Sequence, residues 1–402
     1  MALMMAAAAM FTLAGYEFIR SASTVLFKSA YGAENLPLVM AAMPFVVFFG
    51  VALYGWMLSS LGPRRTLLVT SIGSATVIIC CYVVLLTGSK LITPVLFLFK
   101  EFYIVLLIEQ YWSYINSSLS PATSKRINGP ITGIAGVGGA IGGLLVAISA
   151  QTIGAETMIL MAAVALVPAA LLSNMTFQCF GEPDMPSDSQ SSGYMGLSLF
   201  RENPVLLSLI AIVLSSQVIG AVLDFKFQSL LSVDFAGDVD RETAFQGSFW
   251  GALNAFVLFL QFVVSPLLLS SIALRWVHFL VPTVNLTAIG LAIIEPSLLT
   301  VGLAFFLFKA FDYSIFRAAK EVLYVPLGFE ERYRAKQVID VFGYRAGKGI
   351  SSSLIVVAQK AGVLVSNYYL FVGFFLAAVW LALIFPLTRH QKVKTEISSV
   401  DP

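Results

Sequence analysis

The chain has 402 residues, of which 58% are hydrophobic and 11% are charged, and its mean hydropathy is +0.88. A soluble globular protein carries about 25% charged residues, so this composition excludes an ordinary soluble domain and indicates a membrane protein. The formal net charge of +2 gives no reason to expect a nucleic-acid partner. Cys80, Cys81 and Cys179 lack the spacing of metal ligands, and we interpret them as reduced packing residues.

Apolar stretches of about 20 residues recur along the whole chain, and each can cross about 30 Å of hydrocarbon as a helix. Runs such as 45–53 and 371–384 lack the polar alternation of barrel strands. The first stretch lacks a basic leader and continues into Glu17 and Arg20, so we interpret it as a span and not a signal peptide. The predicted spans are 3–28, 36–60, 66–88, 93–118, 128–151, 156–177, 204–231, 244–271, 275–294, 297–325, 337–358 and 366–387.

A polar stretch around 181–193 separates the first six spans from the last six. We therefore predict an N-terminal six-helix bundle over 1–180, a cytoplasmic linker over 181–203, a C-terminal six-helix bundle over 204–388 and a basic cytoplasmic tail over 389–402. The tripeptide at 98–100 in the fourth span recurs at 307–309 in the tenth. Parallel halves of this kind characterise major facilitator transporters, so the predicted fold class is all-α, with twelve transmembrane helices in two halves.

Basic loop residues set the predicted orientation, because Lys and Arg concentrate on the cytoplasmic side of a membrane. One side of the arrangement holds Arg64, Arg65, Lys125, Arg126, Arg201, Arg275, Arg332, Arg334, Arg389, Lys392 and Lys394. The other side holds chiefly Lys90, Arg241 and Lys360. Both termini are therefore expected in the cytoplasm. A bacterial cell inner membrane is the default expectation, because no transit peptide is evident.

Charged residues within the spans point to a functional cavity, because each costs about 2.5–3.5 kcal/mol at the centre of a span. They occur in spans one, four, seven, ten and eleven and are nearly absent from spans three, six, nine and twelve. In span one, Glu17, Arg20, Ser21, Thr24 and Lys28 form a single stripe at helical spacing. We therefore expect a basic, aromatic-lined cavity for a small organic anion.

The residues predicted to contact that anion are cationic or aromatic: Arg20, Lys28, Lys100, Lys226, Lys309, Arg317, Lys320, Arg345, Lys348, Tyr103, Tyr111 and Trp112. The carboxylates predicted to gate the cavity or to carry protons are Glu17, Glu101, Glu109, Asp224, Asp312, Glu321 and Asp340. A structural alternative is that pairs three residues apart, such as Glu17 with Arg20, only neutralise their own helix. Lys28, Lys348 and Asp340 lie near span ends, where they could instead reach water.

Small residues dominate the fifth span. Gly138 and Gly142, and likewise Gly139 and Gly143, are four residues apart, which allows a neighbouring backbone to approach closely. We interpret these glycines mainly as packing residues.

Enzyme chemistry has little support in the sequence. His278 and His390 have no partners for a catalytic triad or a metal site, and the chain has no Walker-type phosphate loop. We expect no catalytic activity, no metal and no cofactor.

One region resembles a known family. Arg317-Ala-Ala-Lys-Glu-Val-Leu-Tyr-Val-Pro-Leu, followed by Lys336-Gln-Val-Ile-Asp-Val and Arg345-Ala-Gly-Lys, is similar to the nucleotide translocases of plastids and intracellular bacteria. The resemblance implies a major-facilitator-like fold that exchanges ATP for ADP or imports nucleotides with protons. It makes Arg20, Lys226, Lys320 and Lys348 candidate phosphate contacts, with Tyr and Phe side chains stacking on the base. Ser23 stands where that family has a lysine.

Three functions stay open at this point. The leading prediction is a secondary transporter, a monomer in membrane lipid, that moves a nucleotide or related phosphorylated organic anion by alternating access. A proton-coupled facilitator of another organic anion, working through Glu101, Glu109 or Asp312, is the second. The third is a non-transporting receptor or scaffold built on a transporter fold.

Overall fold

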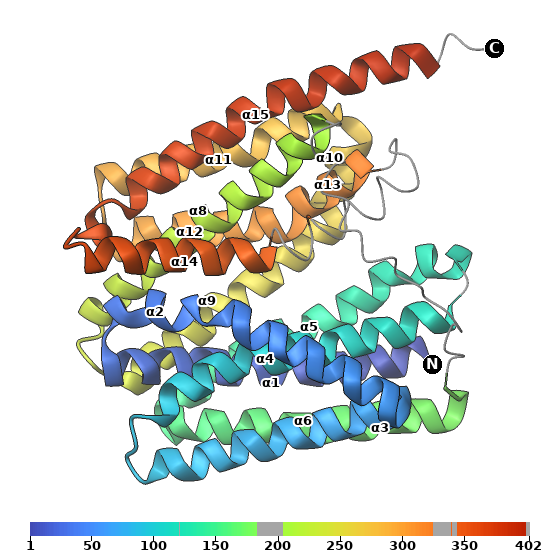
Figure 1. Ribbon diagram of the computed structural model, residues 1–402, viewed down its shortest axis with the longest axis vertical. Coiled ribbons are helices and arrows are strands. Elements are labelled where there is room, and N and C mark those ends of the chain that lie inside the picture. Colours follow the sequence, from blue (N-terminus) through green and yellow to red (C-terminus); the bar gives the residue numbers. More distant parts are fainter. Residues whose placement is uncertain (120, 183–203, 325–338, 340–343, 399–402) are drawn as a thin grey trace. The chain divides into compact units, whose positions relative to one another are not determined.

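A computed structural model describes residues 1–119, 121–182, 204–324, 339 and 344–398, without the side chains of 121–128, 204, 344–346 and 388–398. The described residues form helices and turns and contain no strand (Figure 1). The chain divides into two compact units. Unit 1 is Met1–Ser189 with Ser232–Leu258, and unit 2 is Gln190–Leu231 with Phe259–Pro402.

Unit 1 is built around its first helix, which contacts three of its neighbours and is largely buried. Its elements in chain order are α1 (Ala2–Tyr31), η1 (Ala33–Asn35), α2 (Leu36–Ala41), α3 (Met43–Leu86), α4 (Ile92–Ser118), α5 (Pro121–Ile153), α6 (Ala155–Phe180) and α9 (Val239–Phe259, to Leu258 in this unit). α1 packs against α4, α5 and α6, and α3 packs against α4 and α6.

Unit 2 contains two short π-helical segments within its long helices. Its elements are α8 (Pro204–Asp234, to Leu231 in this unit), η2 (Leu260–Val264), α10 (Ser265–Ser271), α11 (Leu274–Ile294), α12 (Leu298–Phe311), η3 (Asp312–Phe316), α13 (Arg317–Tyr324), α14 (Tyr344–Lys360), η6 (Val365–Asn367) and α15 (Tyr369–Ser398). The π segments η2 and η3 contact each other, and α11 packs against α12 and α15.

The loop expected between the second and third spans is a tight turn at Gly62, within the stretch labelled α3. Gly62 has φ 76° and ψ 168° within the 44-residue α3. Pro63 disfavours helical geometry at the preceding residue, and glycine can adopt the positive φ. Thr66 donates to the carbonyl of Met57 across this turn at 3.0 Å. In a continuous helix, residues nine positions apart are too far from each other for this hydrogen bond, so the chain folds back at Gly62. The two predicted spans are therefore two helices joined by a tight turn (Figure 1).

The all-helical, multi-spanning fold is confirmed, but the count of twelve spans is not. Nine helices in the described part of the chain are long and apolar enough to cross a membrane. One of them, Ala33–Leu86, contains both predicted spans two and three. α4 and α14 are not among the nine: α4 carries Lys100, Glu101 and Glu109, and α14 has only 17 residues.

The division into two six-helix bundles stays a prediction, as does the placement of the linker and tail. Residues 183–203 lie outside the described residues. α9, which belongs to the second half by sequence, is grouped with the N-terminal helices in unit 1.

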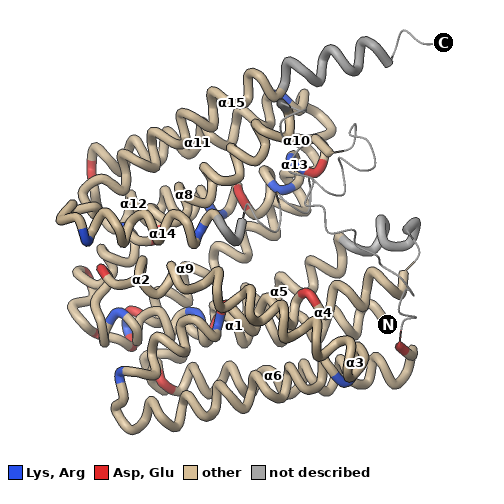
Figure 2. The backbone as a smooth tube through the Cα atoms, viewed as in Figure 1, with Lys and Arg blue, Asp and Glu red and all other residues tan. Residues whose placement is uncertain are grey.

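Charge is unevenly distributed among the helices. α6 has one charged residue, Glu156, and residues 369–387 of α15 have none. Charged residues, drawn blue for Lys and Arg and red for Asp and Glu in Figure 2, are more frequent on α1, α4 and the α12–α13 segment than on these two helices. The apolar helices can face lipid at little cost, and the charged helices are the ones that carry the candidate site.

The glycines of α5 form two stripes with different partners. Gly138 and Gly142 lie against the backbone of α1, where a methyl group on Gly142 would be 2.6 Å from the Ala14 carbonyl oxygen. Gly139 and Gly143 lie against α9, where Gly143 meets the backbone of Gly251. The close approach expected from the sequence is therefore observed, and α5 is the spacer between α1 and α9.

We predict that Gly143→Ala destabilises the protein although alanine favours helices. Its methyl group would overlap the backbone of Gly251, and overpacking costs about 1–3 kcal/mol. Gly73→Ala in α3 is the matched control, because nothing lies within 4 Å of a methyl group there. It should be neutral or stabilising by up to about 1 kcal/mol. Thermal unfolding in detergent would show the difference, and equal Tm values for the two variants would contradict this packing.

Candidate functional site

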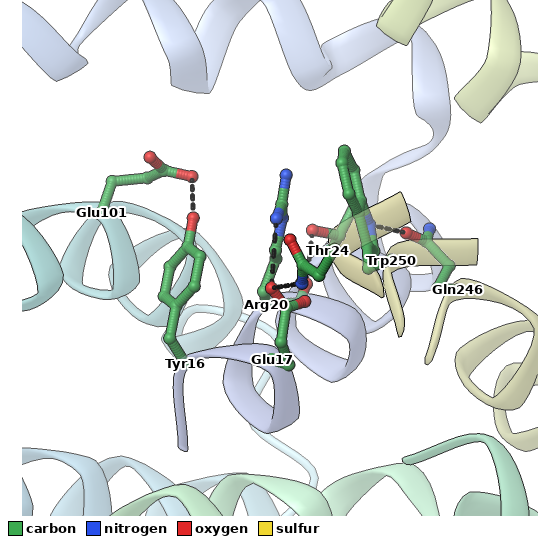
Figure 3. A network of polar contacts seen from close by, with 8 residues as sticks. Tyr16, Glu17, Arg20, Thr24, Glu101, Gln246 and Trp250 are labelled. Carbon is green, nitrogen blue, oxygen red and sulfur yellow. Dashed lines mark hydrogen bonds and ion pairs between the residues drawn. The ribbon is translucent and has the colours of Figure 1, made fainter. Parts of the chain in front are cut away.

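The polar stripe of α1 lies at the centre of a network in unit 1 (Figure 3). Glu17 and Lys28 are buried at 3% and 5% exposure, and Ser21 and Thr24 are buried between them. Arg20 is partly exposed. The stripe meets residues of α4 on one side and of α9 on the other. The residues of the predicted helical face therefore belong to one polar network.

Arg20 is held by a carboxylate and two aromatic rings. Its Nη1 lies 3.4 Å from Glu17 Oε1, and its Cζ lies 3.2 Å from the ring centroid of Trp250 and 5.5 Å from that of Tyr16. A guanidinium over an aromatic face is favourable, and more so when it is partly desolvated. The position of this cation is therefore fixed before any ligand arrives.

Glu17 connects α1 to α9. Its Oε1 accepts a hydrogen bond from Asn254 Nδ2 at 3.0 Å as well as the contact from Arg20. Its Oε2 is buried and has no hydrogen-bond partner among the described residues. The pair with Arg20 is therefore more than a neutralising contact within one helix, because the same carboxylate ties two helices together.

α4 approaches α1 through two further contacts. Lys100 Nζ donates to Thr24 Oγ1 at 2.7 Å and lies 3.6 Å from the Phe97 ring centroid, and its side chain is buried. Tyr16 donates from its hydroxyl to Glu101 Oε1 at 3.3 Å (Figure 3). These contacts place one cation and one carboxylate of α4 beside the α1 stripe.

α9 supplies the partners that sequence reasoning missed. Glu242, Gln246, Trp250 and Asn254 are four residues apart and form one polar face of this helix. Glu242 pairs with Lys28, and Trp250 donates from its indole nitrogen to Gln246 Oε1 at 3.3 Å. The signal in the sequence was the recurrence of polar and aromatic residues at that spacing inside an apolar span.

Unit 2 holds a second charged cluster around Asp312, the first residue of the π segment η3. Asp312 is 3% exposed, and its Oδ1 has no hydrogen-bond partner among the described residues. Four cations from three helices lie within electrostatic range of its carboxylate: Lys309 of α12, Arg317 and Lys320 of α13, and Lys348 of α14. π segments within α-helices are frequently found at functional sites.

Lys309 is directed across unit 2 towards α8. A methyl group on Gly220 of α8 would lie 3.4 Å from Lys309 Nζ. The ammonium also lies 5.2–5.7 Å from the ring centroids of Phe305, Phe308 and Tyr313. The absence of a side chain at Gly220 therefore gives Lys309 its room.

The remaining predicted site residues fall in three groups. Buried or half-buried are Tyr103, Tyr111, Trp112, Asp224 and Lys226. Glu109 and Glu321 are exposed on the surface of the chain, as is Arg317 of the Asp312 cluster. Asp340 and the side chain of Arg345 lie outside the described residues.

Two residues of the first group make specific contacts with their neighbours. The Tyr111 hydroxyl is 2.9 Å from Thr12 Oγ1 of α1, so this residue joins α4 to α1. Asp224 accepts from Gln228 Nε2 at 3.4 Å within α8.

Known structures of similar shape are transporters. The crystal structure of the nucleoside transporter NupG superposes with a TM-score of 0.64 at 14% identity, covering 96% of this chain and 98% of that one. A D-xylose–proton symporter gives 0.66 at 14% identity, covering 95% and 96%. An autoinhibited peptide transporter of the POT family gives 0.65 at 11% identity, covering 97% and 96%. The fold is therefore of the major facilitator type.

The C-terminal part of the chain matches a family model. Residues 251–391 match the family described as TLC ATP/ADP transporter. This stretch includes Lys309, Asp312, Lys320 and Lys348, so the match covers the charged cluster of unit 2. The resemblance to nucleotide translocases is confirmed.

We predict that the Glu17 carboxylate stabilises unit 1 through its two partners. Glu17→Ala leaves Arg20 and Asn254 without their acceptor, which should cost about 1–3 kcal/mol. Glu17→Gln keeps an oxygen for Asn254 and should cost less. Glu295→Gln, at an exposed position, is the control and should leave Tm within experimental error. Thermal unfolding in detergent measures the order, and an unchanged Tm for Glu17→Ala would rule out this role.

Proposed function

We propose that the protein is a secondary transporter that moves a nucleotide or a related phosphorylated organic anion by alternating access. The observation that carries the proposal is the cluster in unit 2, where Lys309, Lys320 and Lys348 act with Arg317 on the buried Asp312. Ammonium and guanidinium groups are the usual protein partners of phosphate oxygens. The match to ATP/ADP transporters over the same residues supports a nucleotide.

The two units differ in how their cations are held, which suggests where the phosphates bind. On α1, Arg20 and Lys28 each pair with a carboxylate of unit 1. In unit 2, four cations from three helices act on the same carboxylate, Asp312. The negative charges of a bound phosphate group would neutralise several of these cations at once. We therefore assign the phosphates to unit 2.

The other predicted site residues take their roles within this proposal. Lys226 and Arg345 add to the phosphate site, and the aromatic side chains of α4 stack on the base. The halves 1–180 and 204–388 are the bundles that rock against each other. The protein works as a monomer in the cell inner membrane with both termini in the cytoplasm.

Proton coupling is the second candidate, and one observation favours it. Asp312 is buried with an oxygen that lacks a hydrogen-bond partner among the described residues, as a protonatable group in a transport pathway often is. Glu101, which accepts from Tyr16, is the corresponding group of unit 1. Exchange and proton symport differ in what drives uptake: counter-substrate in the first, a pH gradient in the second.

We predict that proteoliposomes loaded with ADP take up labelled ATP, and that Lys320→Ala abolishes this uptake. Lys320 is 2% exposed and acts on Asp312, so its loss removes a buried cation from the proposed phosphate site. Lys360→Ala is the matched control, because it removes an exposed lysine from α14 of the same unit. It should transport like the wild type.

The folded state of each variant is checked by size exclusion before uptake is measured. Wild-type uptake by a well-folded Lys320→Ala variant would remove Lys320 from the site. No uptake of any phosphorylated solute by the wild type, with or without counter-substrate, would overturn the nucleotide proposal. Uptake driven by a pH gradient and indifferent to counter-substrate would favour the proton-coupled alternative.

A further inference from the structure

An ion pair between Lys28 and Glu242 lies at the end of unit 1 where α1 finishes and α9 begins. The two residues are 214 positions apart in the chain, and their side chains are 2% and 5% exposed. Lys28 belongs to the last turn of α1, and Glu242 to the first turn of α9. A pair so deeply buried is different from the surface ion pairs that contribute little.

The first turn of α9 makes a second contact, through Asp240. Asp240 Oδ1 accepts a hydrogen bond from the backbone nitrogen of Ala155, the first residue of α6, at 2.7 Å. This carboxylate therefore satisfies one of the open donors that every helix leaves at its N-terminus. Asp240 and Glu242 together tie the start of α9 to α6 and α1.

Further along α9 the contacts are of another kind. Gly247 packs against Val146 of α5, and Gly251 packs against Gly143. Small residues at such an interface can slide or part without leaving a buried charge behind. The Lys28–Glu242 ion pair cannot separate in this way, because its two charges would then be buried without a partner and without water. Opening this end of unit 1 therefore requires both ions to reach solvent together.

We propose that Glu242 is a positioning residue for transport and that the Lys28–Glu242 pair is a latch, which holds the start of α9 on α1 and breaks once in each cycle. The inference rests on the proposed function, since alternating access needs helices of the two sequence halves to separate at each end in turn. It also gives Lys28 a role that differs from the one expected from the sequence: Lys28 serves the latch and does not contact the substrate.

The latch is tested without substrate by the accessibility of a buried cysteine. Thr243 is 0% exposed and follows Glu242, so Thr243→Cys reports on this end of α9. The background has Cys80, Cys81 and Cys179 replaced by serine. A membrane-impermeant maleimide is added from the side of the 234–238 turn, and the rate of labelling is measured in the full-length protein in proteoliposomes.

We expect Glu242→Gln to raise the labelling rate at least several-fold, because the neutral amide no longer holds Lys28. The double exchange Lys28→Glu with Glu242→Lys should bring the rate back towards that of the parent. Asp238→Asn is the matched control: Asp238 is exposed and caps only the backbone of Arg241, at 3.0 Å. It should leave the labelling rate unchanged. If Glu242→Gln does not fold, Glu242→Asp takes its place, since the shorter side chain also weakens the pair.

An unchanged labelling rate in Glu242→Gln, or a failure of the folded double exchange to restore protection, would overturn the latch. Uptake kinetics separate the two roles of Lys28. A latch changes the maximal exchange rate, whereas a substrate contact raises the concentration for half-maximal uptake, and the second result would contradict the proposal. If the wild type transports no nucleotide, the proposed function fails while the labelling result still decides on the latch.

Discussion

Charged side chains inside apolar helices have to be compensated by neighbours, because an isolated ion away from water costs several kcal/mol. This requirement organises both units. In unit 1 it brings α9 to α1, because Glu242 pairs with Lys28 and Asn254 donates a hydrogen bond to Glu17. In unit 2 it places cations of α12, α13 and α14 within electrostatic range of Asp312. α6, which holds one charged residue, packs mainly through apolar and small side chains.

Close packing makes this compensation possible. The two glycine stripes of α5 bring the backbones of α1 and α9 near enough for side chains of ordinary length to meet. Arg20 reaches Trp250, and Glu17 reaches Asn254, because no side chain of α5 keeps the helices apart. The glycines and the polar stripes are thus parts of one arrangement, although they lie on different helices and were interpreted separately in the sequence.

Local spacing predicted much of this arrangement. The apolar runs indicated helices, the four-residue spacing of glycines indicated close contacts, and the stripe from Glu17 to Lys28 indicated one functional face. The polar face of α9 is visible in local spacing, but its pairing with α1 could not be predicted, because local spacing does not report on contacts between residues 214 positions apart. Glycine followed by proline at 62–63 indicated the turn between the second and third predicted spans, because this dipeptide is typical of turns. The π segment at Asp312 has no pattern of its own in the sequence.

The need to compensate buried charges also explains what a serine at position 23 does for unit 1. Ser23 stands where the nucleotide translocases have a lysine, and its hydroxyl is buried without a hydrogen-bond partner among the described residues. A lysine there would add a buried positive charge to α1, where Arg20 and Lys28 already have their carboxylates. With serine, that charge and its compensation are both avoided. In the proposed function, unit 1 then keeps its ion pairs for holding α1 and α9 together, and the cations around Asp312 in unit 2 recognise the anion.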